Sequence, residues 1–164
     1  MDPDIKTLPE KKLVCLVQTM SLSHNRTVEL WKNFMPRKKE ILNGNGADRY
    51  SIQTYPPGYF ENFNPGISFE KRAAMEVSDF ECIPAGMEAF VLPGGTYAVF
   101  NYKGLSSDTR IFQYIFSVWL PASGYILDHR PHFEILGEKY KNLDPDSEEE
   151  IWIPVKKKTT IPVP

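Results

Sequence analysis

Short alternating runs of hydrophobic residues along this chain predict strands, and two longer stretches carry hydrophobic residues at helical spacing. Residues 12–20 form an apolar run with β-branched side chains, which is typical of a strand. Further strands are predicted at 49–55, 69–77, 86–92, 96–102, about 129–137 and 149–155. The turn signal Pro93-Gly94-Gly95 separates two of these strands. This pattern predicts an antiparallel sheet.

Apolar residues recur every three or four positions in two stretches, so each predicts a helix with one buried stripe. Asn25 can cap the first helix near Thr27, and Pro36 ends or kinks it. Ser106 or Ser107 caps the second helix. The first stripe consists of Leu30, Trp31, Phe34 and Met35, and the second of Ile111, Phe112, Ile115, Phe116 and Trp119.

The order strand, helix, strand pair occurs twice, at about 8–80 and 86–156. This repeat predicts a single α+β domain over residues 1–156, made of duplicated β-α-β-β units. We expect an antiparallel sheet with the helices on one face and a ligand cleft on the other. Residues 157–164 are expected to be a disordered tail.

One face of the predicted sheet combines aromatic, amide and carboxylate side chains, which neither a solvated face nor a core requires. Alternation along the strands places Gln53, Tyr55, Glu76, Tyr97, Glu134 and Trp152 on this face. Trp119, on the second helix, would add a flat wall. The set predicts a ligand pocket centred on Glu134.

A structural role is the alternative for each of these residues. The aromatic residues could be half-buried sheet residues, and Trp119 could be a core residue of its helix. Glu76 could pair with Arg72, and Glu134 with Arg130 or Lys139.

A carboxylate among aromatic rings has a definite chemistry. Burial raises its pKa unless a positive charge compensates. A lipophilic cation would compensate, and each ring face would add about 0.5–2 kcal/mol of cation–π attraction. The same raised pKa would let Glu134 act as a general base toward water. The residues therefore leave binding and hydrolysis open.

Composition excludes several other classes. A net charge of −2 and a pI near 5.9 argue against direct nucleic-acid binding. No apolar stretch approaches the roughly 20 residues that a membrane helix needs, and no signal peptide is expected. Cys15 and Cys82 lack metal-ligand spacing, so we expect no metal and no cofactor. A cytoplasmic protein is the expectation.

Several motifs resemble those of GyrI-like domains, also called AraC-type effector-binding domains. Residues 92–100 read LPGGTYAVF and are followed by Lys103-Gly104, which is similar to the family's central signature. Residues 119–125, 130–136 and 150–155 resemble its helix end and its last two strands. The resemblance covers roughly residues 8–156.

This resemblance implies a small-molecule binding module for hydrophobic, often cationic aromatic compounds, with Glu134 as the pocket glutamate. Standalone members are linked to antibiotic sequestration, to protection or inhibition of DNA gyrase, or to hydrolysis of cyclopropane-bearing genotoxins. Gyrase and a second copy of the chain, paired through a sheet edge, are therefore candidate partners. The chain begins almost directly with its first strand, so we do not expect it to control transcription alone.

Overall fold

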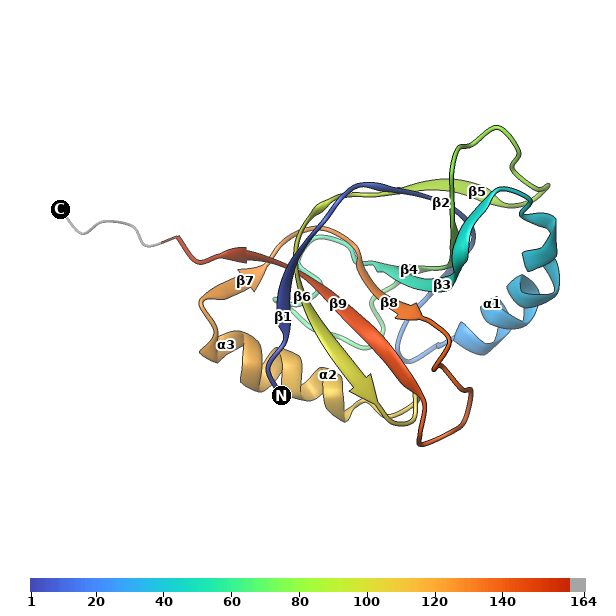
Figure 1. Cartoon of the computed structure of the whole chain (residues 1–164). Coiled ribbons are helices and arrows are strands. Elements are labelled where there is room, and N and C mark those ends of the chain that lie inside the picture. The colour runs from blue at the N-terminus through green and yellow to red at the C-terminus, as the bar shows by residue number, and fades with distance from the viewer. Residues whose placement is uncertain (160–164) are drawn as a thin grey trace.

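The computed structural model describes residues 1–159 and contains one nine-stranded, largely antiparallel sheet flanked by helices (Figure 1). The strands are β1 (Asp4–Leu8), β2 (Lys11–Met20), β3 (Gly44–Thr54), β4 (Phe69–Val77), β5 (Glu88–Leu92), β6 (Gly95–Lys103), β7 (Tyr125–Leu127), β8 (His132–Leu136) and β9 (Glu148–Lys157). Their spatial order is β1-β6-β9-β8-β3-β4-β2-β5, and β7 pairs with the end of β9. The helices are α1 (Thr27–Phe34), the 3₁₀ helix η1 (Met35–Glu40), α2 (Arg110–Tyr114), the π-helical turn η2 (Ile115–Trp119) and α3 (Leu120–Ala122).

The two ends of this sheet are joined by a bent two-stranded ribbon. β1 leads into β2, and β5 leads into β6, so both ends of the sheet belong to the same pair of chain segments. Leu8 pairs with Gly95 and Lys11 with Leu92, so the pairing keeps one register across the bend. Figure 1 shows the two segments arching together over the molecule. Because β2 also pairs with β4 and β6 with β9, the ribbon closes the sheet into a barrel.

Gly94 is required where this ribbon bends. A Cβ atom at Gly94 would lie 2.7 Å from the carbonyl oxygen of Leu8 and 3.0 Å from the amide nitrogen of Glu10. We expect Gly94→Ala to lower the free energy of unfolding by about 1–3 kcal/mol, because backbone atoms must move to admit the methyl group. Chemical denaturation measures this effect. Gly124→Ala is the matched control, since a Cβ atom there meets nothing within 4 Å; equal losses in both variants would contradict the argument.

The barrel interior holds a hydrophobic core with several large aromatic side chains. Its buried members are Leu8, Leu13, Cys15, Tyr50, Ile52, Ala74, Leu92, Tyr97, Val99, Phe133 and Trp152. Phe133 stacks on Trp152, with ring centroids 5.2 Å apart, and meets Tyr97 edge to face at 5.3 Å. Side chains of this size fill a small barrel completely.

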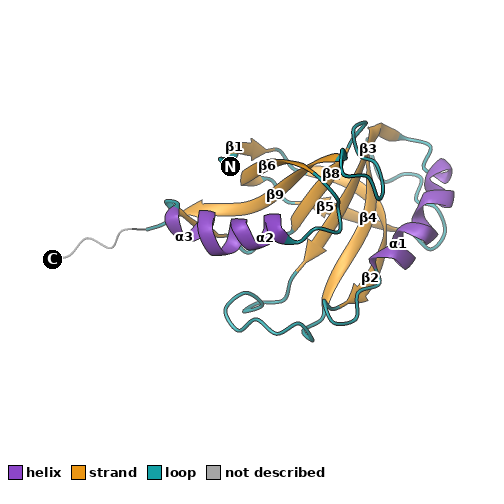
Figure 2. Cartoon of the chain, turned by 90° about the horizontal axis from the view of Figure 1, so that it is seen from below, coloured by secondary structure: helices purple, strands orange, loops and turns teal. Residues whose placement is uncertain are grey.

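The helices pack on the outer surface of the barrel, each over one of two repeated units. α1 covers β2 and β4 through Leu30 and Phe34, while α2 and η2 cover β6 and β9 through Ile115 and its neighbours. The units are β2-α1-β3-β4 and β6-α2-β8-β9, and they meet where β3 pairs with β8. Figure 2 shows α1 and α2 lying apart on the strands. The seam between β3 and β8 therefore runs between the two helices.

The α+β class with a largely antiparallel sheet and flanking helices is confirmed. The pairing of β1 with β6 was not predicted, because its five residues carry a weak pattern. The tail was predicted to begin at residue 157, but β9 extends to Lys157, and the Lys158 ammonium donates to the carbonyl oxygen of Ser123 at 2.9 Å. The rest of the predicted tail, residues 160–164, lies outside the described residues.

Candidate functional site

Glu134 lies on β8 at the seam, and its side chain points outward toward the helix layer. It pairs across the sheet with Ser51 on β3 and Ile151 on β9. Ile151 belongs to the core beneath α2, which fixes the face that Glu134 shares. The Glu134 Oε2 atom is buried and has no hydrogen-bond partner among residues 1–159. A buried carboxylate oxygen without a donor is costly, so this atom marks a candidate binding point.

Three polar side chains lie on the same face of the sheet as this carboxylate, on β3, β4 and β9. Gln53 is buried two residues along β3 from Ser51, and its Nε2 atom donates to Ser51 Oγ at 3.3 Å. Lys71 pairs with Gln53 from β4, and its ammonium donates to Thr27 Oγ1 at the start of α1, at 3.1 Å. The third residue, Glu149, lies two residues before Ile151 on β9, so it is a diagonal neighbour of Glu134.

Burial dominates the electrostatics of the site. It raises the pKa of Glu134, and the nearby Lys71 ammonium and the Gln53 amide oppose that rise. Burial lowers the pKa of Lys71, while Glu134 and Glu149 favour its charged form. Burial and the Glu134 charge raise the pKa of Glu149 to about 7, and Lys71 partly offsets this. Two carboxylates and one ammonium therefore share a largely dehydrated site.

Aromatic rings from the loop between β3 and β4 cover the same seam. Tyr55 packs edge to face on His132 at 5.0 Å, and Phe60 stacks on His132 at 5.2 Å and 14°. Phe60 also meets Phe116 of η2, with centroids 5.1 Å apart. Tyr59 lies behind Tyr55 at 4.5 Å. This aromatic cover, defined as Tyr55, Tyr59, Phe60, Phe116 and His132, joins the loop to the second helix across the seam.

His132 is part of this cover and carries no charge near neutral pH. It is 6% exposed, and burial lowers its pKa to about 3. A neutral imidazole between rings behaves as one more flat surface. Burial also raises the pKa of Tyr55, with the Glu134 charge adding to the rise, so Tyr55 keeps its proton.

The structure brings together only some of the predicted site residues. Gln53 and Tyr55 lie on the face of Glu134, as expected. Tyr97 and Trp152 do not: they face the barrel interior, 5.7 Å apart, and pack on Phe133. The face that carries Glu134 is also the face on which the helices pack. The prediction of a cleft opposite the helices was therefore wrong, because the sheet closes on itself and fills its other face.

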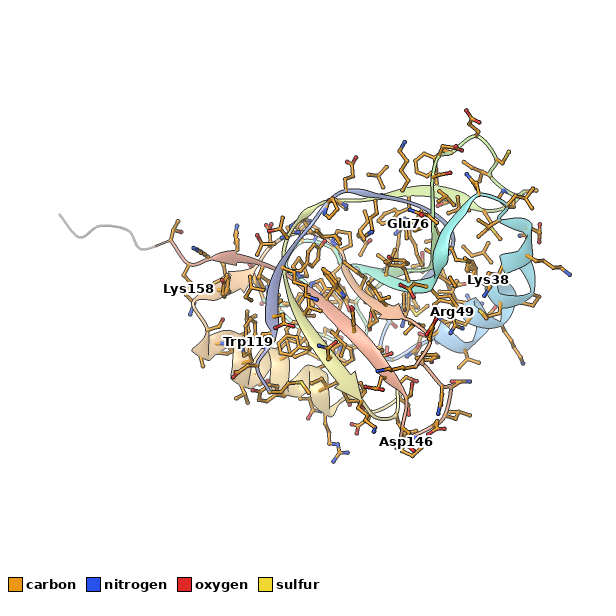
Figure 3. All side chains as sticks on the ribbon, viewed as in Figure 1. Lys38, Arg49, Glu76, Trp119, Asp146 and Lys158 are labelled. Atoms are coloured by element: carbon orange, nitrogen blue, oxygen red, sulfur yellow. The ribbon has the colours of Figure 1, made fainter. Side chains whose placement is uncertain are left out.

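Glu76 and Trp119 also have structural roles in this arrangement. Glu76 lies beside Leu13 on the interior face and forms an ion pair with Lys11 at 2.9 Å. Trp119 packs edge to face on Phe100 at 5.3 Å, within the core beneath α2. Figure 3 shows Glu76 and Trp119 in separate parts of the molecule.

Sequence reasoning missed Lys71 and Glu149, although each leaves a signal. Lys71 interrupts an outward-facing row on β4 that is otherwise apolar, namely Phe69, Ala73, Met75 and Val77. Glu149 similarly heads the row Ile151, Ile153 and Val155 on β9. A single charge in an apolar row indicates a buried, paired group.

Within residues 1–159, no group of three or more His, Cys, Asp or Glu side chains is arranged to hold a metal ion. No helix in this range is long and apolar enough to cross a membrane.

The sequence as a whole decides the family. Residues 1–156 match the model of the GyrI-like small molecule binding domain. The chain belongs to this family. Transcriptional regulator BrlR from Pseudomonas aeruginosa is 30% identical over 130 residues, which cover 77% of this chain and 45% of that regulator. The chain therefore spans about half the length of the curated relative it matches.

Solved structures share the GyrI-like fold along almost the whole chain. The EcmrR C-terminal domain is 18% identical with a TM-score of 0.70, and the match covers 94% of this chain and 97% of that one. SAV2435, solved with bound tetraphenylphosphonium, is 19% identical with a TM-score of 0.65, over 95% of this chain and 94% of that one. At these identities the likeness concerns the fold alone.

Proposed function

We propose that this GyrI-like domain binds bulky aromatic monocations at the β3–β8 seam, with Glu134 as the charge-reading group. The main support for this proposal is the buried Glu134 Oε2 atom, which lacks a hydrogen-bond partner among residues 1–159. A ligand cation would supply the missing positive charge, and Gln53 would help to hold the carboxylate ionised.

The aromatic cover supplies the other half of this recognition. Tyr55, Phe60, Phe116 and His132 form a cluster of flat, uncharged rings, and His132 lies two residues from Glu134 on β8. Ring faces attract a dehydrated cation, and their large apolar area favours aromatic substituents on it. SAV2435 binds tetraphenylphosphonium on the same fold, which makes this ion the natural first probe.

Ligand entry requires the loop between β3 and β4 to move. Phe60 bridges His132 of β8 and Phe116 of η2, so it fills the space between this strand and the second helix. Phe60 itself is 37% exposed and Phe63 is 59% exposed, so this part of the loop lies at the surface. Displacement of Phe60 would open the seam while β3 and β4 stay in place.

A pair of ions with the same shape and opposite charge tests the proposed function. We expect tetraphenylphosphonium to bind at least about tenfold more tightly than tetraphenylborate, because a buried carboxylate repels the anion. Isothermal titration calorimetry at pH 8 on the whole chain measures both affinities. Equal binding of the two ions, or binding of the borate alone, would refute a charge-reading site.

A further inference from the structure

Lys71 places a positive charge within the proposed cation site, because its side chain lies on the same face of the sheet as Glu134. Its neighbours in the outward row of β4 are apolar, and Gln53 separates it from β8. Its Nζ atom donates to Thr27 Oγ1 at 3.1 Å. This hydrogen bond holds a positive charge near the start of α1, where the helix dipole disfavours a cation. Nearby negative charge offsets that cost.

Glu134 and Glu149 supply the negative charge. Both face outward on neighbouring strands, and the three residues carry a net charge of −1 when all are ionised. Lys71 makes no ion pair within 4.0 Å with either carboxylate in the described chain, which leaves Glu134 Oε2 unsatisfied. The Lys71 ammonium thus offsets part of the negative charge of the two carboxylates without contacting Glu134.

We propose that Lys71 is an internal counter-cation that opposes ligand binding, and that Glu149 supplies the second negative charge that lets the site accept one further positive charge. This inference rests on the proposed function and adds the residues that set the ligand's charge. A bound monocation makes the net charge of the ligand and the cluster of Lys71, Glu134 and Glu149 zero, whereas a bound dication or anion leaves a net charge. The site is therefore selective for single positive charge.

Removal of the Lys71 charge gives the direct test. We expect Lys71→Met to bind tetraphenylphosphonium about tenfold more tightly than the wild type, because the substitution removes a positive charge that repels the ligand. Lys71→Arg keeps the charge and is expected to gain no affinity. Lys39→Met, on an exposed side chain of η1, controls for the loss of a lysine charge from the whole protein.

Calorimetric titration of these four proteins separates the inference from the proposed function. Tighter binding by Lys71→Met alone supports the inference, including the case in which the wild type binds too weakly to measure. Wild-type binding with no gain in Lys71→Met overturns the inference and leaves the proposed function standing. A gain of similar size in Lys39→Met also overturns it. No binding by any of the proteins overturns both.

The pH dependence of binding tests the role of Glu149. Its neighbours are Glu134 on β8, Lys71 on β4 and Tyr102, its partner on β6. Around it, a surface hollow of about 390 Å³ also contains Asp48, Lys103, Glu138, Lys139, Glu148 and Glu150. Glu149 thus connects the buried cluster to solvent. Its pKa of about 7 means that it is mostly neutral at pH 6 and mostly ionised at pH 8.

The sign of the pH effect follows from this ionisation. We expect the wild-type affinity for tetraphenylphosphonium to rise about tenfold from pH 6 to pH 8, as the cluster gains its second negative charge. In Glu149→Gln the rise should be lost from this range, with the affinity near the wild-type value at pH 6. An unchanged rise in Glu149→Gln would overturn the role of Glu149. Thermal unfolding of each variant confirms that it is folded under these conditions.

Discussion

Glu134→Gln is expected to weaken tetraphenylphosphonium binding by about 30- to 100-fold, or roughly 2–3 kcal/mol. The substitution keeps the shape of the side chain and removes the charge next to the proposed cation. Lys71 and Glu149 then balance each other, so the variant site has no net charge to offer the ligand. Isothermal titration at pH 8, where the wild-type cluster is most negative, gives the largest difference.

Glu148→Gln provides the matched control for this loss. Glu148 begins β9, is about half exposed and lies 3.9 Å from the Lys139 ammonium at the surface. The same chemical change there should alter the affinity by less than about twofold, because solvent screens exposed charges. Equal effects of the two substitutions would show that overall charge, and not the buried carboxylate, attracts the ligand. Unchanged binding by Glu134→Gln would move the ligand away from the seam.

Trp152→Ala is expected to lower the free energy of unfolding by about 3–5 kcal/mol, since it empties the middle of the barrel. The indole is 7% exposed and packs between Phe133 and Tyr97. Its buried Nε1 atom has no hydrogen-bond partner in the described chain. Trp152→Phe therefore loses no hydrogen bond and should cost less than about 1.5 kcal/mol. Urea denaturation of both variants measures these differences.

Ligand titration of Trp152→Phe distinguishes a core residue from a pocket residue. The structure places this side chain on the face opposite Glu134, so the tetraphenylphosphonium affinity should stay within about twofold of the wild type. A tenfold loss in a variant that unfolds normally would mean that Trp152 contacts the ligand, as the sequence pattern predicted. The structural assignment of the interior face would then be wrong.

Alternation along a strand shows which side chains share a face of that strand, but it does not show which face of the next strand lies beside them. Within β8, alternation correctly separates Glu134 from Phe133, because successive side chains point to opposite faces. It does not say which face of β9 lies beside Glu134. Register settles that question: Glu134 pairs with Ile151, so Trp152 turns inward beside Phe133. A shift of one residue in the register moves all the side chains of a strand to the opposite face.

Both faces of this sheet are apolar, for different reasons, so apolar side chains do not distinguish a core face from a ligand-binding face. One face packs under helices and the other fills a closed barrel. Aromatic residues such as Tyr97 therefore needed no ligand to explain them. The closure depends on a ribbon that bends at Pro9 and Gly94, whose pairing spans segments about 90 residues apart.

The sequence by itself determined the α+β repeat, the position of both helices and the isolation of Glu134 among the apolar residues of its strand. These features are local, since they depend on the period of hydrophobic residues and on one carboxylate within an apolar strand. Only the tertiary structure decided that Lys71 and Glu149 share the face of Glu134, while Glu76, Tyr97 and Trp152 do not. These neighbours lie on different strands, so their proximity depends on register and barrel closure, which are set by packing across the whole chain.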